Sequence, residues 1–391
     1  MKIGDLQINN RFVHSATHEC MASETGFVTD RIIRRYEKLA KGEIGLIIPG
    51  YLYVHPLGRA AKYQTGIHCD EMIDGLQKLV DTVHQYGGKI VFQLVHSGRQ
   101  TTKEIIGQTP IAPSKKGRDP MLLVKPREMS EEEIREIIKS FGNAAKRAAQ
   151  AGADGIQLHG AHGYLINQFL SPFFNHRKDA WGGSDENRFL FLKEVILEIR
   201  KKIPKGMPIF IKLNTQDYTP KKGITPELAR EYAKRLKFLG INGIEVSCGV
   251  LSYSVFNVMR GDVPTKELVV NLPWWKKHLA RIMLKRMVGK FDLQEGYNVE
   301  AAKLIKPVLG ELPLFVVGGL RRVSHMEDLL EKGYADFISM SRPFIRQPSL
   351  VKEIKERKAK AVSCVSCNKC LAAVANDMPV ACYNKKFPVL S

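Results

Sequence analysis

The sequence predicts an α/β protein built on a (β/α)8 barrel, or TIM barrel, followed by a short cysteine-rich extension. Eight short apolar segments rich in Ile, Val, Leu and Phe alternate with helical segments along the chain. Parallel strands that are buried on both faces need such nearly continuous apolar runs. Four of the seven cysteines lie between positions 364 and 382, after the last of these segments. A doubly wound open sheet is the alternative that the pattern leaves open.

Each expected strand is only four or five residues long. The strands are expected at residues 12–15, 46–50, 90–94, 155–159, 209–213, 243–247, 314–318 and 337–340. Residues 3–8, joined to Phe12 through Asn9-Asn10, resemble a hairpin that plugs the floor of the barrel. The long segment 249–294, between the sixth and seventh strands, is rich in aromatic and charged residues, which is typical of a lid or an interface element.

Helix start signals occur between the strands, as a repeated β–α pattern requires. They combine side chains that cap a helix with acidic residues or proline in the first turn. The signals are Asp70, the capping box that opens at Ser130, the pair Thr225-Pro226 and a second capping box at Ser324.

Composition limits the class of protein. Of the 391 residues, 44% are hydrophobic and 26% are charged, which is globular composition. No apolar run approaches the ~20 residues that cross a bilayer, and the N-terminus lacks the apolar core of a signal peptide. We therefore expect a cytoplasmic protein with no membrane partner.

The net charge of +20 favours anionic partners, although the cations are spread along the chain as on solvated faces. The chain contains no recognised nucleic-acid module and no interleaved aromatic and basic stripe, so nucleic-acid binding is not expected.

Candidate site residues follow the strands, because barrel enzymes place their sites at the carboxyl ends of the strands. His159, His162 and Tyr164 lie on one such loop. Two imidazoles and a phenol can hold a carbonyl or an oxyanion and supply a proton. A metal site and simple packing are the alternatives, and the loop contains no acidic residue that would favour a metal.

The loops after the last two strands suit a phosphate group. Gly318-Gly319 lets the backbone approach a ligand closely, and Arg342, which follows Ser341, adds a planar forked donor. Barrels commonly bind phosphate at these two loops. An ordinary glycine turn and a surface arginine stay open as the simpler interpretation.

The clustered cysteines predict a metal site. Their pattern, C-x2-C-x2-C-x11-C, places four thiols at metal-ligand spacing, and disulfides are not expected without a secretory signal. Tetrahedral zinc, a cubane iron–sulfur cluster and thiols that bind nothing are the three alternatives. The four residues are Cys364, Cys367, Cys370 and Cys382. We therefore expect a barrel over residues 1–346 and a basic helix with a cysteine tail over residues 347–391.

The residues around the histidine loop resemble a known family. Residues 159–172 (HGAHGYLINQFLSP), continued by 175–179 and 182–188, closely resemble the signature of the Old Yellow Enzyme family of FMN-dependent oxidoreductases. Asn10-Arg11, residues 93–99 (QLVHSGR), 317–319 and Arg342 match that family in order. The resemblance spans the chain from about residue 3 to residue 346.

The resemblance implies FMN over the mouth of the barrel and reduction of an activated C=C bond. Hydride would leave flavin N5, His159 and His162 would anchor the activating oxygen, and Tyr164 would donate the proton. Lys212 would lie near flavin N1, where the family usually has an arginine. Gln93 would form a hydrogen bond with the pyrimidine edge of the flavin ring. The remaining implied flavin contacts are Ala16, Thr17, His18 and Gly50 around the ring, and Gly318, Gly319, Ser341 and Arg342 at the phosphate.

At position 18 the sequence resembles the branch that contains 2,4-dienoyl-CoA reductase and trimethylamine dehydrogenase. Other ene-reductases carry threonine or cysteine where this chain has His18. In that branch a very similar cysteine run binds a [4Fe–4S] cluster, which implies Cys364, Cys367, Cys370 and Cys382 as its ligands.

Because no strand-GxGxxG-helix unit follows, electrons would come from NAD(P)H docking on FMN or from an acidic carrier such as ferredoxin or flavodoxin. The expected substrate is a small activated alkene, as a carbonyl compound, an acid or a CoA thioester. The alternative is an NAD(P)H:flavin oxidoreductase or oxidase with zinc or nothing in the tail. Association of identical chains stays open.

Overall fold

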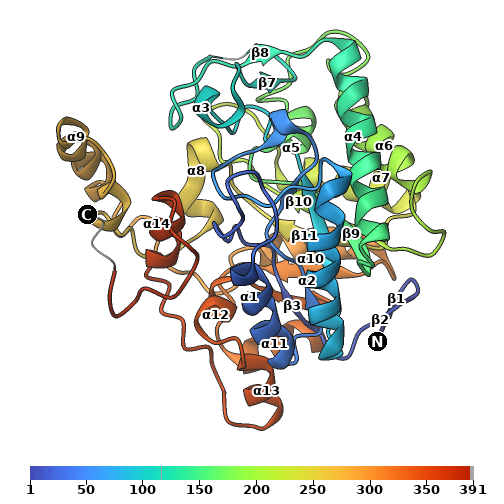
Figure 1. The fold of residues 1–391 in the computed structure, drawn as a ribbon, viewed down its shortest axis with the longest axis vertical. Coiled ribbons are helices and arrows are strands. Elements are labelled where there is room, and N and C mark those ends of the chain that lie inside the picture. The colour runs from blue at the N-terminus through green and yellow to red at the C-terminus, as the bar shows by residue number, and fades with distance from the viewer. Residues whose placement is uncertain (116, 388–391) are drawn as a thin grey trace.

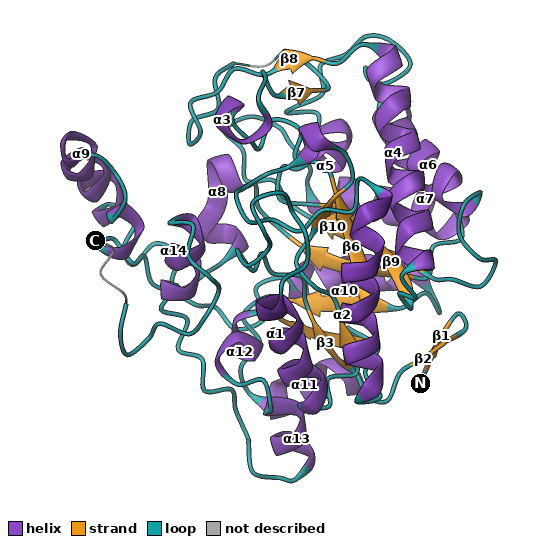
Figure 2. Cartoon of the chain, in the orientation of Figure 1, coloured by secondary structure: helices purple, strands orange, loops and turns teal. Residues whose placement is uncertain are grey.

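Within the described residues, nine short strands form one parallel sheet near the centre of the molecule (Figure 2). The computed structural model describes residues 1–115 and 117–387. Along the sheet the order is β4-β3-β13-β12-β11-β10-β9-β6-β5. The bounds are β3 (Phe12–His14), β4 (Leu46–Ile47), β5 (Leu52–Tyr53), β6 (Val91–Val95), β9 (Gly155–Gly160), β10 (Ile209–Asn214), β11 (Gly243–Ser247), β12 (Leu314–Val317) and β13 (Phe337–Met340).

The sheet closes into a barrel, which confirms the predicted fold. β13 pairs with β3 in parallel, so the last strand meets the first. β4 and β5 are two halves of the second strand, and Ile47 in β4 forms a parallel bridge with Ile90 beside β6. All eight predicted strands are present within one or two residues of their expected positions, with the second one interrupted.

Helices cover the outside of the barrel (Figure 1). Short elements also occur in the loops, among them β7 (Ile111–Ala112) and β8 (Arg127–Glu128). The helices are α1 (Asp30–Lys41), α2 (Ile73–Gln85), α3 (Lys103–Ile106), α4 (Glu131–Gln150), α5 (Leu165–Leu170), α6 (Asp185–Arg200), α7 (Pro226–Phe238), α8 (Leu251–Val258), α9 (Trp274–Lys285), α10 (Val299–Leu309), α11 (Val323–Glu331), α12 (Arg342–Arg346), α13 (Leu350–Lys355) and α14 (Lys369–Ala375).

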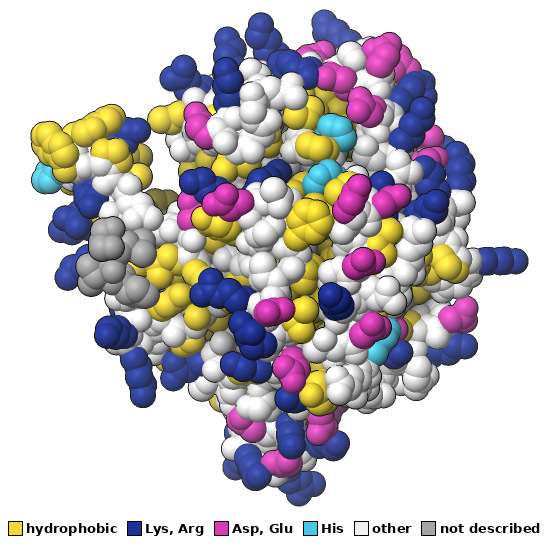
Figure 3. All heavy atoms as spheres, viewed as in Figure 1, with side chains coloured by type: hydrophobic (Ala, Val, Ile, Leu, Met, Phe, Trp, Pro, Cys, Tyr) yellow, Lys and Arg dark blue, Asp and Glu magenta, His cyan; other side chains and the backbone are white. Residues whose placement is uncertain are grey.

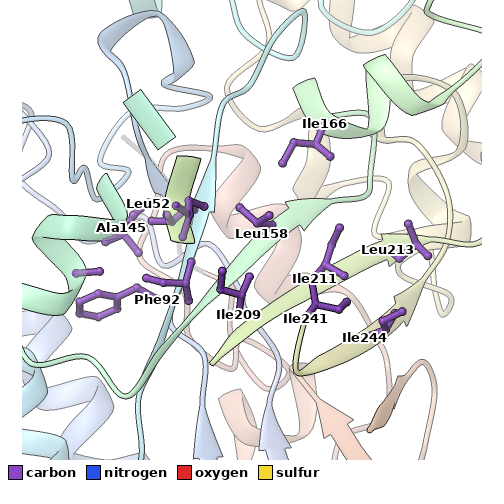
Figure 4. Close-up of a cluster of buried hydrophobic side chains, with 14 of the residues drawn as sticks. Leu52, Phe92, Ala145, Leu158, Ile166, Ile209, Ile211, Leu213, Ile241 and Ile244 are labelled. Carbon is purple, nitrogen blue, oxygen red and sulfur yellow. The ribbon is translucent and has the colours of Figure 1, made fainter. Parts of the chain in front are cut away.

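The core lies mainly between the strands and the helices. In β10, Ile209, Ile211 and Leu213 belong to this outer layer (Figure 4). Because neighbouring side chains of a strand point to opposite faces, Phe210 and Lys212 point into the barrel. Phe210 belongs to a separate apolar cluster inside the barrel. Lys212 is two residues further along β10 and so lies nearer to the carboxyl ends of the strands, where the polar site begins.

The floor of the barrel is closed by the N-terminal hairpin, as expected, but its turn was predicted wrongly. β1 (Lys2–Ile3) pairs with β2 (Leu6–Gln7), and Gly4 takes the positive φ of +57° that the turn needs. Asn10 has a different task, because its side-chain oxygen accepts the amides of Phe12 and Gly45.

Of two predicted capping boxes, the one at the start of α4 is confirmed and the one at the start of α11 is wrong. Ser130 accepts the amide of Glu133, and the reciprocal bond is present, so the predicted capping box is confirmed. The capping box at Ser324 is wrong, because α11 begins at Val323 and its N-cap, Arg322, makes no side-chain cap. Glu295 instead accepts the amides of Arg321 and Arg322. A side chain 26 and 27 positions away therefore binds the backbone just before the helix.

Candidate active site

Lys212 and Glu245 form a buried ion pair inside the mouth of the barrel. The Lys212 Nζ lies 3.2 Å from Glu245 Oε2, and the two side chains are 3% and 0% exposed. Lys212 also donates to Ser15 Oγ at 2.7 Å, and Ser15 in turn donates to Glu245 Oε1 at 2.6 Å. Sequence reasoning missed Glu245, although a carboxylate in the middle of the apolar strand 243–247 was a usable signal.

A chain of side-chain amides extends this network around the barrel. Gln157 donates to Glu245 Oε2 at 2.9 Å, and Gln93 donates to Gln157 at 2.5 Å. The Gln93 Oε1 is buried and has no hydrogen-bond partner among the described residues. A buried acceptor without a partner costs free energy, so this oxygen suits a ligand N–H. The ring N–H on the pyrimidine edge of FMN is such a donor, so Gln93 fits its predicted task.

The histidine loop is brought together as the sequence predicts. The ring centroids of His159 and Tyr164 are 4.7 Å apart, and those of His159 and His162 are 5.1 Å apart. His162 Nε2 lies 2.7 Å from Ser247 Oγ. His159 Nδ1 accepts the amide of Ala161 at 3.4 Å, which leaves the proton on Nε2 as a free donor.

Tyr51 is a member of this cluster that sequence reasoning missed. The Tyr164 hydroxyl donates to the Tyr51 hydroxyl at 2.9 Å. The Tyr51 ring also stacks on His18, with 5.6 Å between the ring centroids. Tyr164 is only 3% exposed, whereas Tyr51 is partly exposed. The hydroxyl of the buried Tyr164 is therefore bonded to a residue that is itself partly exposed.

Burial keeps all of these groups neutral. Desolvation, and then the charges of His162 and Lys212, hold the pKa of His159 well below its usual value. Desolvation and Lys212 lower the pKa of His162 to about 3. Burial, together with Tyr51, raises the pKa of Tyr164 well above 10. Neutral imidazoles and a neutral phenol are hydrogen-bond donors toward a carbonyl oxygen and do not hold a charge of their own.

The same physics makes the fold sensitive to acid through His14, a fully buried residue of β3. Burial and Arg35 lower its pKa from 6.5 to about 3, so the folded protein keeps it neutral. The unfolded chain binds the proton once the pH falls below 6.5, and stability is then lost toward pH 3. We expect this histidine alone to remove about 2 kcal/mol of unfolding free energy between pH 7 and pH 5.

Guanidinium unfolding of the wild type and of His14→Gln at both pH values tests this expectation. The variant is expected to lose less stability on acidification than the wild type. Equal losses in the two proteins would show that His14 is not the cause.

The residues predicted to contact the flavin ring follow β3 and β4, and the backbone amide of one of them is already in use. Gly50 donates its amide to Glu19 at 2.7 Å, and a Cβ there would lie 2.0 Å from the same carboxylate. This amide is therefore already used, and Gly50 can offer a ligand its carbonyl oxygen. Ala16 is partly buried, and burial lowers the pKa of His18 to about 4.

The predicted phosphate residues lie on neighbouring loops. Thr17 Oγ1 lies 2.5 Å from Ser341 Oγ, which joins the first and last of these loops. Gly318 and Gly319 have φ values of +139° and +69°, which glycine tolerates best. The Arg342 guanidinium donates through Nη1 to the side chain of Asn368, so it links the phosphate loop to the cysteine tail.

The four tail cysteines line one small cavity, of about 20 Å³, with Arg342 and Arg346 at its wall. Arg346 Nη1 lies 3.5 Å from Cys382 Sγ. Among residues 1–115 and 117–387, no three Cys, His, Asp or Glu side chains are grouped as ligands of a metal ion. The predicted metal site is therefore not shown, although its four thiols share one cavity.

Comparison with curated proteins identifies relatives of this chain. A model described as the NADH:flavin oxidoreductase / NADH oxidase family matches residues 1–251 and 256–361. An NADPH dehydrogenase of Clostridium acetobutylicum is 34% identical over 349 residues, which are 89% of this chain and 91% of that protein. An NADH oxidase of Thermoanaerobacter brockii is 35% identical over 90% of this chain, and the chain spans 50% of that longer protein.

Comparison with solved structures also identifies similar proteins. A complex of 2-naphthoyl-CoA reductase with 2-naphthoyl-CoA matches with a TM-score of 0.85 and 26% identity, over 98% of this chain and 56% of that chain. An old yellow enzyme homologue from Zymomonas mobilis matches with a TM-score of 0.73 and 25% identity, over 94% of both chains. The first match leaves only about eight residues unmatched (2% of 391), so it includes most of the cysteine tail.

None of the described helices is both long enough and apolar enough to span a bilayer.

Proposed function

Because the chain belongs to the NADH:flavin oxidoreductase / NADH oxidase family and is an FMN oxidoreductase, we propose that it reduces an activated C=C bond. The resemblance to old yellow enzymes seen in the sequence is confirmed at the level of the family. The observation that carries the finer proposal is the cluster of His159, His162 and Tyr164 beside the buried Lys212. A neutral donor pair next to a phenol suits an enone, an enoate or an enoyl thioester.

The residues fit FMN in three respects. The Gln93 oxygen has no partner, Gly318 and Gly319 allow close backbone approach, and Arg342 is a forked donor at the adjacent loop. When bound, FMN supplies the hydride that the side chains cannot. Lys212 would supply positive charge to the flavin ring, and the neighbouring Glu245 would offset part of that charge. As part of this proposal, residues 1–346 hold the flavin and residues 347–391 form the tail.

The protein side chains then orient the substrate and move one proton. His159 Nε2 and His162 hold the carbonyl oxygen of the substrate, where negative charge grows as the bond is reduced. Tyr164 gives its proton to the α-carbon of the substrate. Tyr51, hydrogen-bonded to Tyr164 and partly exposed, returns a proton from the solvent.

An NAD(P)H oxidase that needs no alkene is the second candidate, because one relative is named an NADH oxidase. Anaerobic titration with NADPH and with NADH, followed by a panel of enoates and enoyl-CoAs, separates the two. Reduction of FMN followed by its reoxidation with an alkene supports the proposal. Reoxidation by oxygen alone, with no response to any activated alkene, would favour the oxidase. A colourless protein that takes up no added FMN would refute both.

For the tail we propose a [4Fe–4S] cluster bound by Cys364, Cys367, Cys370 and Cys382. A cubane spreads its ligands over four irons, whereas zinc draws four thiolates to about 2.3 Å from one centre. The proposal is supported by the cysteine spacing and by the one cavity that the four thiols line. The arginines at the wall would balance the negative cluster. An acidic one-electron carrier would then be a second electron donor beside NAD(P)H.

Cys367→Ala is expected to remove the iron and leave FMN bound. Anaerobically purified wild type should contain about four irons per chain, and the variant should contain far less, with an unchanged flavin absorption band. Cys69→Ala, a cysteine outside the tail, is the matched control and should keep both cofactors. Zinc or no metal in the wild type would refute the cluster. Loss of FMN together with iron would show that the tail is needed for the barrel.

A further inference from the structure

Helix α9 carries an unusual concentration of exposed apolar side chains. Trp274 is 84% exposed, Trp275 is 60%, Leu279 is 62% and Met283 is 59%. Not one of the twelve residues from Trp274 to Lys285 is buried in the described structure. The helix projects from the body of the molecule at the upper left of Figure 1, and Figure 3 shows apolar side chains gathered on it. Exposed apolar groups of this size indicate an interaction surface.

The apolar side chains form one face of the helix. Trp275, Leu279, Ile282 and Met283 follow the i, i+4, i+7, i+8 spacing of a single helical stripe. The partly buried residues Ala280, Leu284 and Met287 lie on a different face. The exposed stripe is therefore turned away from the protein.

The charge around this stripe has a single sign. Residues 268–291 contain no aspartate or glutamate. The same stretch contains six cationic residues, which are Lys276, Lys277, Arg281, Lys285, Arg286 and Lys290. A surface that pairs with α9 must therefore offer both an apolar layer and negative charge.

The base of the helix is fixed, so the stripe is presented in a defined direction. Asn271, three residues before α9, bonds to Asn376 at the end of α14 through both its amide and its side chain. Lys369 of α14 pairs with Glu267 at 3.0 Å, next to the same segment. Polar contacts thus hold the segment before α9 against α14, which belongs to the cysteine tail.

We propose that α9 is a membrane-surface helix that binds anionic phospholipid. Two tryptophans, an aliphatic stripe and flanking lysines and arginines are the composition of a helix that lies in the plane of the lipid headgroups. A second copy of this chain fits less well, because two such helices face to face would bring like charges together. The proposal does not depend on the flavin chemistry. The expectation of no membrane partner considered only segments that cross the bilayer, and the proposal concerns a helix that would lie on its surface.

Tryptophan fluorescence provides a direct test. The chain has three tryptophans, and the third, Trp181, is 3% exposed. In a Trp181→Phe background all emission comes from α9. We expect the emission to shift to shorter wavelength, and the protein to sediment, with vesicles of phosphatidylglycerol and phosphatidylcholine. Vesicles of phosphatidylcholine alone should produce neither effect, and high salt should weaken binding.

Two α9 variants and one control locate the surface. Lys276→Glu/Arg281→Glu is expected to weaken vesicle binding at least tenfold, because each cation near an anionic surface contributes to binding. Trp275→Ser/Leu279→Ser should weaken it by a similar factor. The control is Lys139→Glu/Lys193→Glu, which changes two exposed lysines on α4 and α6 equally in charge and should bind nearly as the wild type.

Three results would overturn the proposal. Absence of binding to anionic vesicles is the first. Equal weakening by the control variant would place the lipid contact elsewhere. A free protein that sediments as an oligomer, with α9 emission already at short wavelength and lost in Trp275→Ser/Leu279→Ser, would assign the stripe to a second copy of the chain.

Discussion

Tyr164→Phe is expected to slow alkene reduction by about 10²–10⁴-fold while leaving the reduction of FMN by NAD(P)H nearly unchanged. The phenol reaches the site as a buried, neutral donor beside His159, with a pKa well above its ordinary value. Removing the hydroxyl deletes the proton but keeps the ring and its packing. Hydride transfer from a nicotinamide to the flavin would need no proton from this residue.

Stopped-flow measurement of the two half-reactions separates these effects. FMN is first reduced anaerobically by NADH or NADPH, and the reduced protein is then mixed with an alkene that it accepts. If both half-reactions slow equally, Tyr164 is not the proton donor and acts on the binding of the flavin.

Tyr51→Phe is the informative companion variant. Tyr164 then loses its partner at 2.9 Å but keeps its own proton. A relay predicts that the first turnover stays fast and that steady-state turnover slows. It also predicts a larger solvent isotope effect in the steady state than in the wild type. An unchanged steady state would remove Tyr51 from the proton path and leave it as a packing residue.

The sequence predicted the framework of the site because that framework depends on local patterns. Short apolar strands, spaced by helices with capping residues, indicate a barrel, and the barrel places His159 and Gly318 at the same end. The signature around His159 then identified the family. The second strand is interrupted near Gly50, whose amide turns to the distant Glu19. That contact joins residues 31 positions apart and has no local signal.

What the sequence did not predict depends on contacts between distant strands. Tyr51 and Tyr164 are 113 positions apart, and Ser15 and Glu245 are 230 apart. Neither pair has a spacing that a motif could reveal. The cysteine tail is the opposite case. Its spacing is a strong local signal, yet the thiols in the structure are not grouped around a single ion. A spacing constrains which residues are ligands and leaves their geometry to the metal itself.

Glu245→Gln is expected to lower the free energy of unfolding by about 3–5 kcal/mol, because it leaves the Lys212 ammonium buried without its counter-charge. Lys212 would keep its bond to Ser15, and Gln157 could still donate to the new amide oxygen. The loss therefore reports mainly the missing charge, together with the bond from Ser15 Oγ, because the amide offers one oxygen where the carboxylate accepts two donors. Guanidinium unfolding of the flavin-free protein measures it.

The matched double variant, Lys212→Met/Glu245→Gln, decides whether the pair stabilises the fold or serves the ligand. Removal of both charges relieves the desolvation that each one imposes, so its stability should return to within about 1 kcal/mol of the wild type. Its affinity for reduced FMN should nevertheless be lower than that of the wild type, since the cation proposed near the flavin is gone. A double variant that is stable and binds reduced FMN like the wild type would show that this buried pair is not part of the flavin site. A single variant as stable as the wild type would mean that water already reaches Lys212.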